Sequence, residues 1–480
     1  MAFEGVPTDL FIGGAWRPSD DGSRFDVLDP ATGSAIASVA NGSIADGLAS
    51  VEAAHAAAAG WAATPPRARG EVLRRAFALM TERSDEIARL MVAENGKALA
   101  DASGEVTYAA EFFRWFSEEA VRLNGSISTA PSGTNRILVV HQPVGVSVLV
   151  TPWNFPAAMA TRKIGPALAA GCTVILKPAS ETPLTALLLA QLLHEAGVPA
   201  GVVNVVPSTR SGAMVGAMLK DHRVRKLSFT GSTEVGRILL AQAAETVVNC
   251  SMELGGNAPF VVFADADLDA AIAGAMIAKM RNAGEACTAA NRFYVQTAVA
   301  DEFARRLAEA MGALRMGSGL EQGVQVGPLV NASTRDKVDS LVRSTVAVGA
   351  KVLIGGEPTP GPGYFYPPTV LAAVPKDAPV LREEIFGPVA PVVAFDTEEE
   401  AIRLANQTEF GLVSYVYTGD LARGLRVAEA IESGMVGINR GLVSDPAAPF
   451  GGVKQSGIGR EGGHEGILEF TESKYIAATW

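Results

Sequence analysis

The chain has 480 residues, of which 48% are hydrophobic and 19% charged, a composition typical of a folded protein and too long for one ordinary core. Two or three domains are therefore expected. The formal net charge of −11 and the lack of any Lys/Arg-rich run exclude a nucleic-acid-binding protein of the usual basic kind.

The start of the chain, MAFEGVPTDLF, lacks the basic and apolar pattern of a secretory signal, and no run of about 18 apolar residues predicts a membrane span. The three cysteines, Cys172, Cys250 and Cys287, are odd in number and lack the spacing of zinc ligands. The sequence therefore predicts a cytoplasmic protein in a reducing compartment, without a membrane partner, a disulfide framework or a metal site.

In the first third of the chain, apolar residues recur every three or four positions, which predicts helices over residues 45–63, 67–94 and 101–121. From residue 144 short apolar runs alternate with helical stretches. The predicted strands are VGVSVLV, TVILKP, GVVNVVP and RKLSFTG. This βαβ alternation predicts an α/β fold with a parallel sheet covered by helices on both faces.

The alternation resumes after residue 253, with predicted helices over residues 268–281 and from residue 299. The predicted strands here are APFVVF, NRFYVQ, KVLIGG, LVSYVYT and MVGIN. No flexible linker separates the two halves, so tightly packed domains are expected. Two further segments, RILVVHQPVGV and the tail SKYIAATW, are predicted to be strands. Two cysteines, Cys172 and Cys250, also lie in predicted sheet segments. The two segments are interpreted as edge strands that could pair with a neighbouring subunit, and the two cysteines are interpreted as inert core residues.

Two residues in glycine-rich surroundings are candidates for covalent chemistry. Cys287 lies in NAGEACTAAN, where small neighbours leave room for a carbonyl to approach a thiolate. A lone cysteine is more often core filling. Glu253 lies directly before Gly255 and Gly256, and a carboxylate at such a turn can act as a general base, although most loop glutamates are solvated.

Other candidates follow predicted strands. Asn154 in TPWNFP, held between two prolines, can donate to an oxyanion, although an ordinary turn asparagine is the simpler interpretation. Lys177 in LKPAS can reach a ribose, and the helix beginning near Ser232 in FTGSTEVG offers N–H groups to a pyrophosphate. The GxGxxG match at Gly457 follows no strand, so it is interpreted as a chance match.

The motifs PWNFP, KPAS, FTGSTEVG, MELGGN, GEAC, EEIFGP and PFGGVKQSGIGREG, in this order, resemble the aldehyde dehydrogenase superfamily over essentially the whole chain. The similarity is greatest to succinate-semialdehyde dehydrogenases, through TRKIGPALAAGCTVILKPAS, VRKLSFTGSTEVG and KMRNAGEAC. The resemblance implies that Cys287 is the nucleophile, Glu253 the general base and Asn154 an oxyanion donor. The implied cofactor contacts are Trp153, Lys177, Ser180, Gly231, Ser232, Leu254, Glu384 and Phe386.

The resemblance also implies a Rossmann-like cofactor domain at residues 1–120 and 144–254, and an α/β catalytic domain at 255–455. A small β oligomerisation flap and tail would comprise residues 121–143 and 456–480. Members of the superfamily are homodimers or homotetramers. Strands of the flap would extend a sheet of the partner.

In succinate-semialdehyde dehydrogenases, positions matching Arg162, Arg281 and Ser444 bind the substrate carboxylate, and arginine suits this role because its planar fork matches a carboxylate. Succinate semialdehyde is therefore the expected substrate. The alternatives are glutarate or 2-oxoglutarate semialdehyde, and a non-catalytic structural oligomer.

Cofactor preference depends on Ser180, where members strict for NAD+ often have glutamate. Serine removes the repulsion of a 2′-phosphate and favours NADP+, while the adjacent Glu181 leaves NAD+ possible.

Overall fold

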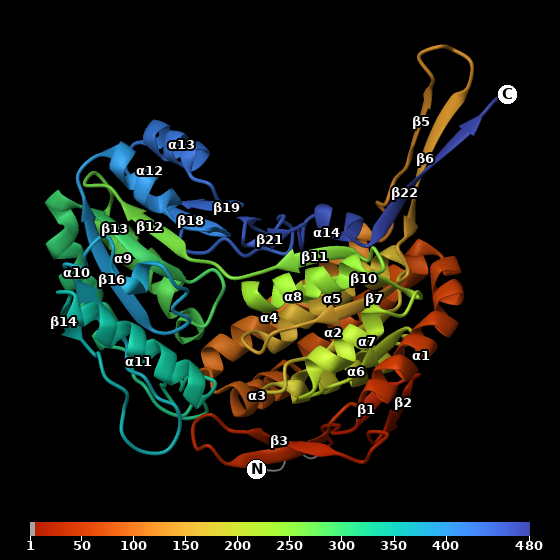
Figure 1. The fold of residues 1–480 in the computed structure, drawn as a ribbon, viewed down its shortest axis with the longest axis horizontal. Coiled ribbons are helices and arrows are strands. Elements are labelled where there is room, and N and C mark those ends of the chain that lie inside the picture. The colour runs from red at the N-terminus through yellow and green to blue at the C-terminus, as the bar shows by residue number, and fades with distance from the viewer. Residues whose placement is uncertain (1–4) are drawn as a thin grey trace.

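Two β-sheets, each with helices packed on it, lie side by side, and a narrow three-stranded sheet projects from one of them (Figure 1). The computed structural model describes residues 5–480, so the first four residues of the predicted cofactor domain lie outside the described part. The α/β class is confirmed. The predicted domain limits stay a prediction.

The first sheet has the order β2-β1-β9-β8-β7-β10-β11-β21. Its strands are β1 (Leu10–Ile12), β2 (Ala15–Arg17), β7 (Val146–Val150), β8 (Val174–Lys177), β9 (Val203–Val205), β10 (Val224–Thr230), β11 (Asn249–Glu253) and β21 (Gly457–Ile458). The five central strands are parallel, while β1, β2 and β21 join antiparallel at the two edges. The apolar runs of β7 and β8 are buried throughout, as expected for strands covered on both faces.

The helices of this half are α1 (Ile44–Ala63), α2 (Pro66–Glu82), α3 (Ser84–Asn95), α4 (Leu99–Glu119), α5 (Pro156–Ala170), α6 (Pro183–Glu195), α7 (Ser211–Leu219) and α8 (Thr233–Ala244). The single helix predicted over residues 67–94 was wrong, because the chain breaks at Arg83. Arg83 leaves helical geometry and pairs with Glu86 at 2.7 Å. Both α2 and α3 pack on α4, so the apolar periodicity continues across the break and conceals it.

The second sheet has the order β14-β15-β16-β13-β12-β18-β19. Its strands are β12 (Ala258–Val262), β13 (Ala290–Gln296), β14 (Lys351–Ile354), β15 (Thr369–Ala372), β16 (Val389–Phe395), β18 (Val413–Tyr417) and β19 (Met435–Ile438). Its helices are α9 (Leu268–Met280), α10 (Thr297–Gly312), α11 (Ala332–Ala347), α12 (Glu398–Asn406) and α13 (Leu421–Ala430). The five strands predicted in this half are confirmed.

The projecting sheet has the order β22-β6-β5, formed by β5 (Ser126–Thr129), β6 (Arg136–Pro143) and β22 (Thr471–Ala478), and the C-terminus lies at its outer end (Figure 1). The prediction that RILVVHQPVGV is an edge strand was wrong, because β6 pairs on both sides. The tail strand β22 is an edge, as predicted, and its side chains are mostly exposed. Between the two sheets, β21 pairs with β11.

Gly457 of the GxGxxG match begins β21. A Cβ there would lie 1.9 Å from the carbonyl oxygen of Met252, so strand contact by itself requires this glycine. The two other cysteines also differ from expectation. Cys172 is buried, but it lies in the turn before β8 rather than in a strand, and Cys250 in β11 is only half-buried.

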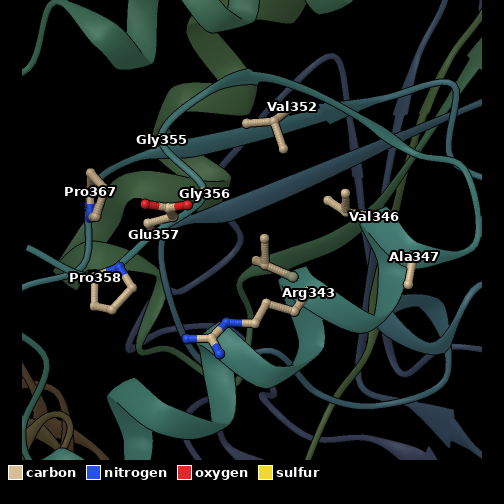
Figure 2. Close-up of a pocket in the computed structure, with 10 residues that line it drawn as sticks. Arg343, Val346, Ala347, Val352, Gly355, Gly356, Glu357, Pro358 and Pro367 are labelled. Atoms are coloured by element: carbon tan, nitrogen blue, oxygen red, sulfur yellow. The ribbon is translucent and has the colours of Figure 1, made fainter.

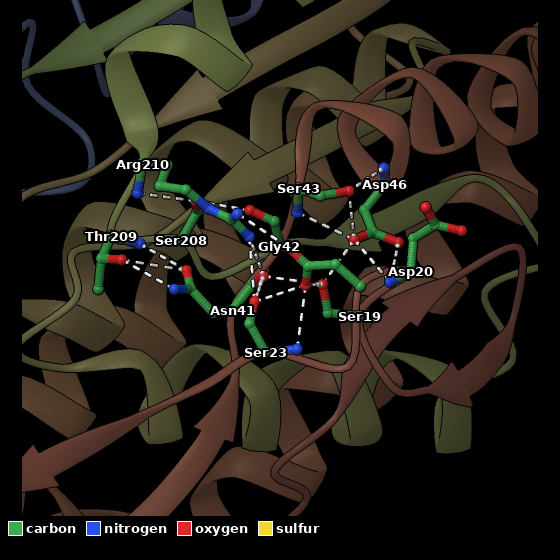
Figure 3. Close-up of polar contacts among 11 residues, drawn as sticks. Ser19, Asp20, Ser23, Asn41, Gly42, Ser43, Asp46, Ser208, Thr209 and Arg210 are labelled. Carbon is green, nitrogen blue, oxygen red and sulfur yellow. Dashed lines mark hydrogen bonds and ion pairs between the residues drawn. The ribbon is translucent and has the colours of Figure 1, made fainter.

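Polar contacts fix the N-terminal segment to the start of α1 (Figure 3). Asp46 and Ser43 form the capping box of α1, in which the buried Asp46 carboxylate accepts from Ser43 N at 2.9 Å and Ser43 Oγ accepts from Asp46 N at 3.1 Å. The Asp46 carboxylate also accepts from Ser19 Oγ at 3.0 Å. Arg210, in the loop after β9, donates to Asn41 O at 3.0 Å. The network therefore ties the segment of residues 19–46 to the loop after β9, at an edge of the first sheet.

The remaining short elements are β3 (Arg24–Leu28), β4 (Ala35–Ala40), β17 (Phe410–Gly411), β20 (Val453–Lys454), α14 (Glu465–Leu468) and the 3-10 turns η1 (Arg281–Gly284) and η2 (Pro379–Leu381). Within residues 5–480, no helix combines the length and the apolar character that crossing a membrane requires.

Candidate active site

A cavity of about 250 Å³ lies where the carboxyl ends of the first sheet's parallel strands face the second sheet. In open α/β folds, ligands bind at this edge. The residues that line it are Pro152, Trp153, Asn154, Met159, Thr230, Gly231, Ser232, Leu254, Gly255, Cys287, Thr334, Lys337, Glu384 and Phe386. Eight of the predicted site residues are among them. Lys177, Ser180, Glu253, Arg162, Arg281 and Ser444 do not line it.

A larger hollow of about 830 Å³ lies between α11 and β14 (Figure 2). Its lining is mainly Val, Pro and Gly, with Arg343 and Glu357 as its charged residues, and Arg343 is already paired with Asp339. It contains none of the predicted site residues. Of these two cavities, the smaller one contains the candidate nucleophile, Cys287.

Cys287 lies in the turn between η1 and β13, and its side chain is half-buried. The preceding residues Asn282 and Ala283 have left-handed φ angles of 53° and 51°, which non-glycine residues adopt at a cost. A Cβ on Gly256 would lie 2.6 Å from the Cys287 carbonyl oxygen, so this glycine lets the two loops touch. Burial, and then the charge of Glu253, raise the pKa of the Cys287 thiol, so a base must remove its proton.

Glu253 ends β11 and is buried, directly before Leu254 in the cavity wall. Neither of its carboxylate oxygens has a hydrogen-bond partner within residues 5–480. Burial raises the pKa of Glu253 to about 8, although the charge of Arg162 opposes the shift. A carboxylate that titrates near neutral pH and has free oxygens is suited to accept and return a proton.

Asn154 follows β7, and its side chain reaches the loop that carries Cys287. Its Nδ2 donates to the carbonyl oxygen of Glu285 at 3.1 Å. This bond uses one of the two amide hydrogens and fixes the plane of the amide, while the other hydrogen stays available. Asn154 therefore offers a donor in the same cavity wall as Cys287.

A helix N-terminus with free N–H groups can bind a pyrophosphate, so the partners of these groups matter at the cavity. Helices α5 and α6 have no side-chain cap of their own. Instead, Glu105 accepts from Ala157 N at 2.9 Å, and Glu94 accepts from Leu184 N at 2.7 Å. At the start of α8 the cap Ser232 lines the cavity, and Glu234 lies in the first turn, but no carboxylate within residues 5–480 accepts a hydrogen bond from its first N–H groups. Of these three helices, α8 is therefore the one whose positive end stays open to an anion.

Glu384 and Phe386, which also line the cavity, suit the binding of a nucleotide. Glu384 accepts from Gly256 N at 3.1 Å, and burial raises the pKa of Glu384 to about 7. Phe386 has a left-handed φ of 56° and meets Trp153 edge-to-face, with 5.4 Å between the ring centroids. A flat ring and a ribose can be held between such groups.

Lys177 and Ser180 lie at the same sheet edge, beyond the cavity. Burial lowers the pKa of Lys177 to about 8, although the charge of Glu181 opposes the shift. Ser180 Oγ donates to Glu181 Oε2 at 3.2 Å.

The residues predicted to bind a substrate carboxylate have different environments. Arg162 on α5 is buried, and its Nε lies 2.5 Å from Glu461 Oε2, so it already has a carboxylate partner. Arg281 is half-buried over the ring of Phe155 at 4.8 Å, and no carboxylate within residues 5–480 forms an ion pair with it. Ser444 is half-buried in the loop after β19.

Four supporting residues were missed from the sequence: Lys97, Glu105, Asn282 and Glu461. Glu461 contacts both Arg162 and Lys163, and Lys97 contacts Glu105 at 2.6 Å. Lys97 lies before α4 and Glu105 within it, so the two are not neighbours three or four residues apart on one helix. No local pattern in the sequence therefore indicated their contact.

A cavity at the carboxyl edge of a parallel sheet, with a cysteine in its wall, is typical of a nucleotide-dependent oxidoreductase. Residues 16–476 match the aldehyde dehydrogenase family. The chain is 60% identical over 441 residues to a succinate-semialdehyde dehydrogenase of Paenarthrobacter nicotinovorans, covering 92% of this chain and 98% of that one. It is 51% identical over 466 residues to a glutarate-semialdehyde dehydrogenase of Pseudomonas aeruginosa, covering 97% and 96%.

Among solved structures, a crystal structure of an E. coli NADP dependent enzyme matches with a TM-score of 0.98 and 48% identity, covering 99% of this chain and 98% of that one. The chain belongs to the aldehyde dehydrogenase family, and it is an NAD(P)+-dependent aldehyde dehydrogenase.

Proposed function

We propose that the enzyme oxidises succinate semialdehyde to succinate through a thioester on Cys287. The supporting observation is Arg281, a half-buried cation without an ion-pair partner among the described residues, at the start of the turn that carries Cys287. Such a cation suits the carboxylate of a short semialdehyde. The 60% identical relative is named for the same substrate.

Glutarate semialdehyde is the second candidate, because a relative named for it is 51% identical over nearly the whole chain. It differs from succinate semialdehyde by one methylene, which a pocket discriminates by only about 1–3 kcal/mol. Kinetics with C4 to C6 semialdehydes, including 2-oxoglutarate semialdehyde, test the choice. The C4 substrate should have the highest kcat/KM, and a higher value for the C5 substrate would replace the assignment.

In the proposed mechanism, Glu253 accepts the proton of the Cys287 thiol, and the thiolate adds to the aldehyde carbon. The oxyanion of the resulting hemithioacetal accepts hydrogen bonds from Asn154 Nδ2 and from the backbone N–H of Cys287. A nicotinamide cofactor held in the cavity would supply the acceptor for the hydride that leaves the hemithioacetal carbon. Glu253 releases the thiol proton to solvent and then takes a proton from water, whose hydroxide adds to the thioester carbon. The acid leaves as the Cys287 thiolate is released.

For the cofactor, we propose that Ser232 and Gly231 at the start of α8 receive the pyrophosphate, and that Glu384, Trp153, Leu254 and Phe386 hold the nicotinamide end. Lys177 and Ser180 would hold the adenosine ribose. Serine at residue 180 carries no charge to repel a 2′-phosphate, so NADP+ is the favoured cofactor and NAD+ is also accepted.

Ser180→Glu should reverse this preference, because a second carboxylate beside Glu181 would repel the 2′-phosphate and bind the free ribose hydroxyls. The Kd of NADP+, measured by calorimetry, should rise at least about tenfold, which corresponds to about 1.4 kcal/mol. The Kd of NAD+ should fall or stay constant. An equal change for both cofactors would remove Ser180 from cofactor selection.

Arg281→Ala should lower kcat/KM for succinate semialdehyde, because the substrate carboxylate would lose its charged partner. The loss should correspond to about 2–5 kcal/mol of transition-state stabilisation. Butanal has no carboxylate, so its kcat/KM should change far less. Equal losses for both substrates would make Arg281 structural. Arg281 is the cleaner position for this test, because Arg162→Ala would also leave Glu461 with one partner fewer.

For the assembly, we propose a homodimer or homotetramer in which the exposed strand β22 extends a sheet of another subunit. Support comes from its position at the edge of the projecting sheet. The domain limits given above are proposed on the same resemblance to the family.

A further inference from the structure

The backbone carbonyl of Asn154 is held by two buried donors from other parts of the chain. Lys97 Nζ, from the loop between α3 and α4, donates to it at 2.7 Å. Asn282 Nδ2, from the turn before Cys287, donates to it at 2.9 Å and also to the carbonyl oxygen of Glu285 at 3.0 Å. Because Asn154 Nδ2 donates to that same Glu285 oxygen, the two loops are joined by several hydrogen bonds.

Lys97 is itself fixed by Glu105. Their side chains are fully buried and 2.6 Å apart. The second oxygen of Glu105 accepts from the backbone of Ala157 at 2.9 Å and Ala158 at 3.2 Å, in the first turn of α5. One carboxylate therefore sets both the start of the helix after Asn154 and the ammonium that holds the Asn154 carbonyl.

A buried ion pair is a weak source of stability, because desolvation of both charges offsets their attraction. A role in fixing the geometry of the site explains the presence of the Lys97–Glu105 ion pair better than a role in stability does. An oxyanion donor must lie within about 0.5 Å of its productive position, and a misplacement of about 1 Å can lower the rate about 100-fold.

We propose that Lys97 and Glu105 are positioning residues that hold the amide of Asn154 in place for the oxyanion. The proposal rests on the role of Asn154 given under the proposed function. It assigns no contact with substrate or cofactor to either residue.

The test is a double-mutant cycle between Asn154→Ala and the paired change Lys97→Met/Glu105→Gln. The paired change removes both charges together, so no uncompensated charge stays buried. The introduced glutamine keeps an acceptor for the backbone of α5, whereas the introduced methionine cannot donate to the Asn154 carbonyl. Thermal unfolding confirms that each variant folds.

Asn154→Ala should lower kcat about 100-fold or more, as loss of an oxyanion donor does. The paired change should lower kcat at least about tenfold in the wild-type background and cause no further loss in the Asn154→Ala background, because Lys97 acts through Asn154. The KM of the aldehyde and the rate of Cys287 alkylation by iodoacetamide should stay near wild-type values.

Glu94→Gln is the matched control, because it neutralises a buried carboxylate that caps α6 in the same manner. It should leave kcat unchanged. Equal losses from the paired change in both backgrounds, or an equal loss in Glu94→Gln, would overturn the proposal while leaving Asn154 as a donor. A normal kcat in Asn154→Ala would instead overturn the proposed role of Asn154 itself.

Discussion

Cys287→Ala is expected to abolish aldehyde oxidation while folding and cofactor binding persist. The thiol forms the covalent bond to the substrate, and no other group of the cavity wall can replace it. The loss in kcat should exceed about 100-fold, which corresponds to at least about 2.7 kcal/mol of activation free energy. Steady-state NAD(P)H formation measures it.

Cys250→Ala provides the control for this variant. Cys250 is also a free, half-buried thiol, but it lies in β11 and does not line the cavity. Its replacement should leave kcat unchanged. Retention of more than about a hundredth of wild-type kcat in Cys287→Ala would remove the residue from the nucleophile position.

Glu253→Gln is expected to give a slowed burst of NAD(P)H followed by a turnover that is slowed still more. Hydrolysis of the thioester needs a base at this position, whereas a slow first acylation can proceed with the small thiolate fraction that solvent sustains. Stopped-flow measurement separates the two phases. Equal slowing of both phases would show that activation of Cys287 needs Glu253 as much as hydrolysis does, and normal turnover would exclude Glu253 from the mechanism.

The pH dependence of turnover provides a second measurement on Glu253. Its pKa is raised to about 8, and only the deprotonated carboxylate can accept a proton. Deacylation in the wild type should therefore slow about tenfold per pH unit as the pH falls below about 8. This limb should disappear in Glu253→Gln.

Glu285→Gln is the control for the pH profile, because burial raises the pKa of Glu285 to about 8 as well. Its side chain accepts from Val330 N at 3.1 Å, and glutamine can keep this bond. The pH limb should persist in Glu285→Gln. If it disappears there and persists in Glu253→Gln, the base is Glu285.

Local patterns in the sequence determined the α/β class, the main parallel strands along the chain and the main candidates of the site. The alternation of apolar runs and helical stretches predicted β7, β8 and β10, because burial on both faces of a parallel sheet demands continuous apolar strands. Motifs at strand ends indicated Asn154 and Ser232, because the carboxyl ends of parallel strands converge at one edge.

Where periodicity was the sole guide, the prediction failed at particular points. The break at Arg83 was hidden because α2 and α3 bury similar faces against α4. The central position of β6 was hidden because pairing on both sides depends on β5 and β22, and β22 comes from the far end of the chain.

Only the tertiary structure decided which charged groups have partners. It gave Arg162 the carboxylate of Glu461, left Arg281 without an ion pair among the described residues, and placed Glu105 and Glu94 on the N-termini of α5 and α6. The physical reason is that periodicity and propensity are properties of neighbouring residues, whereas an ion pair depends on the position of two side chains in space. Helix α8 is therefore recognised as the one open to an anion only because the structure shows that Glu105 and Glu94 cap α5 and α6.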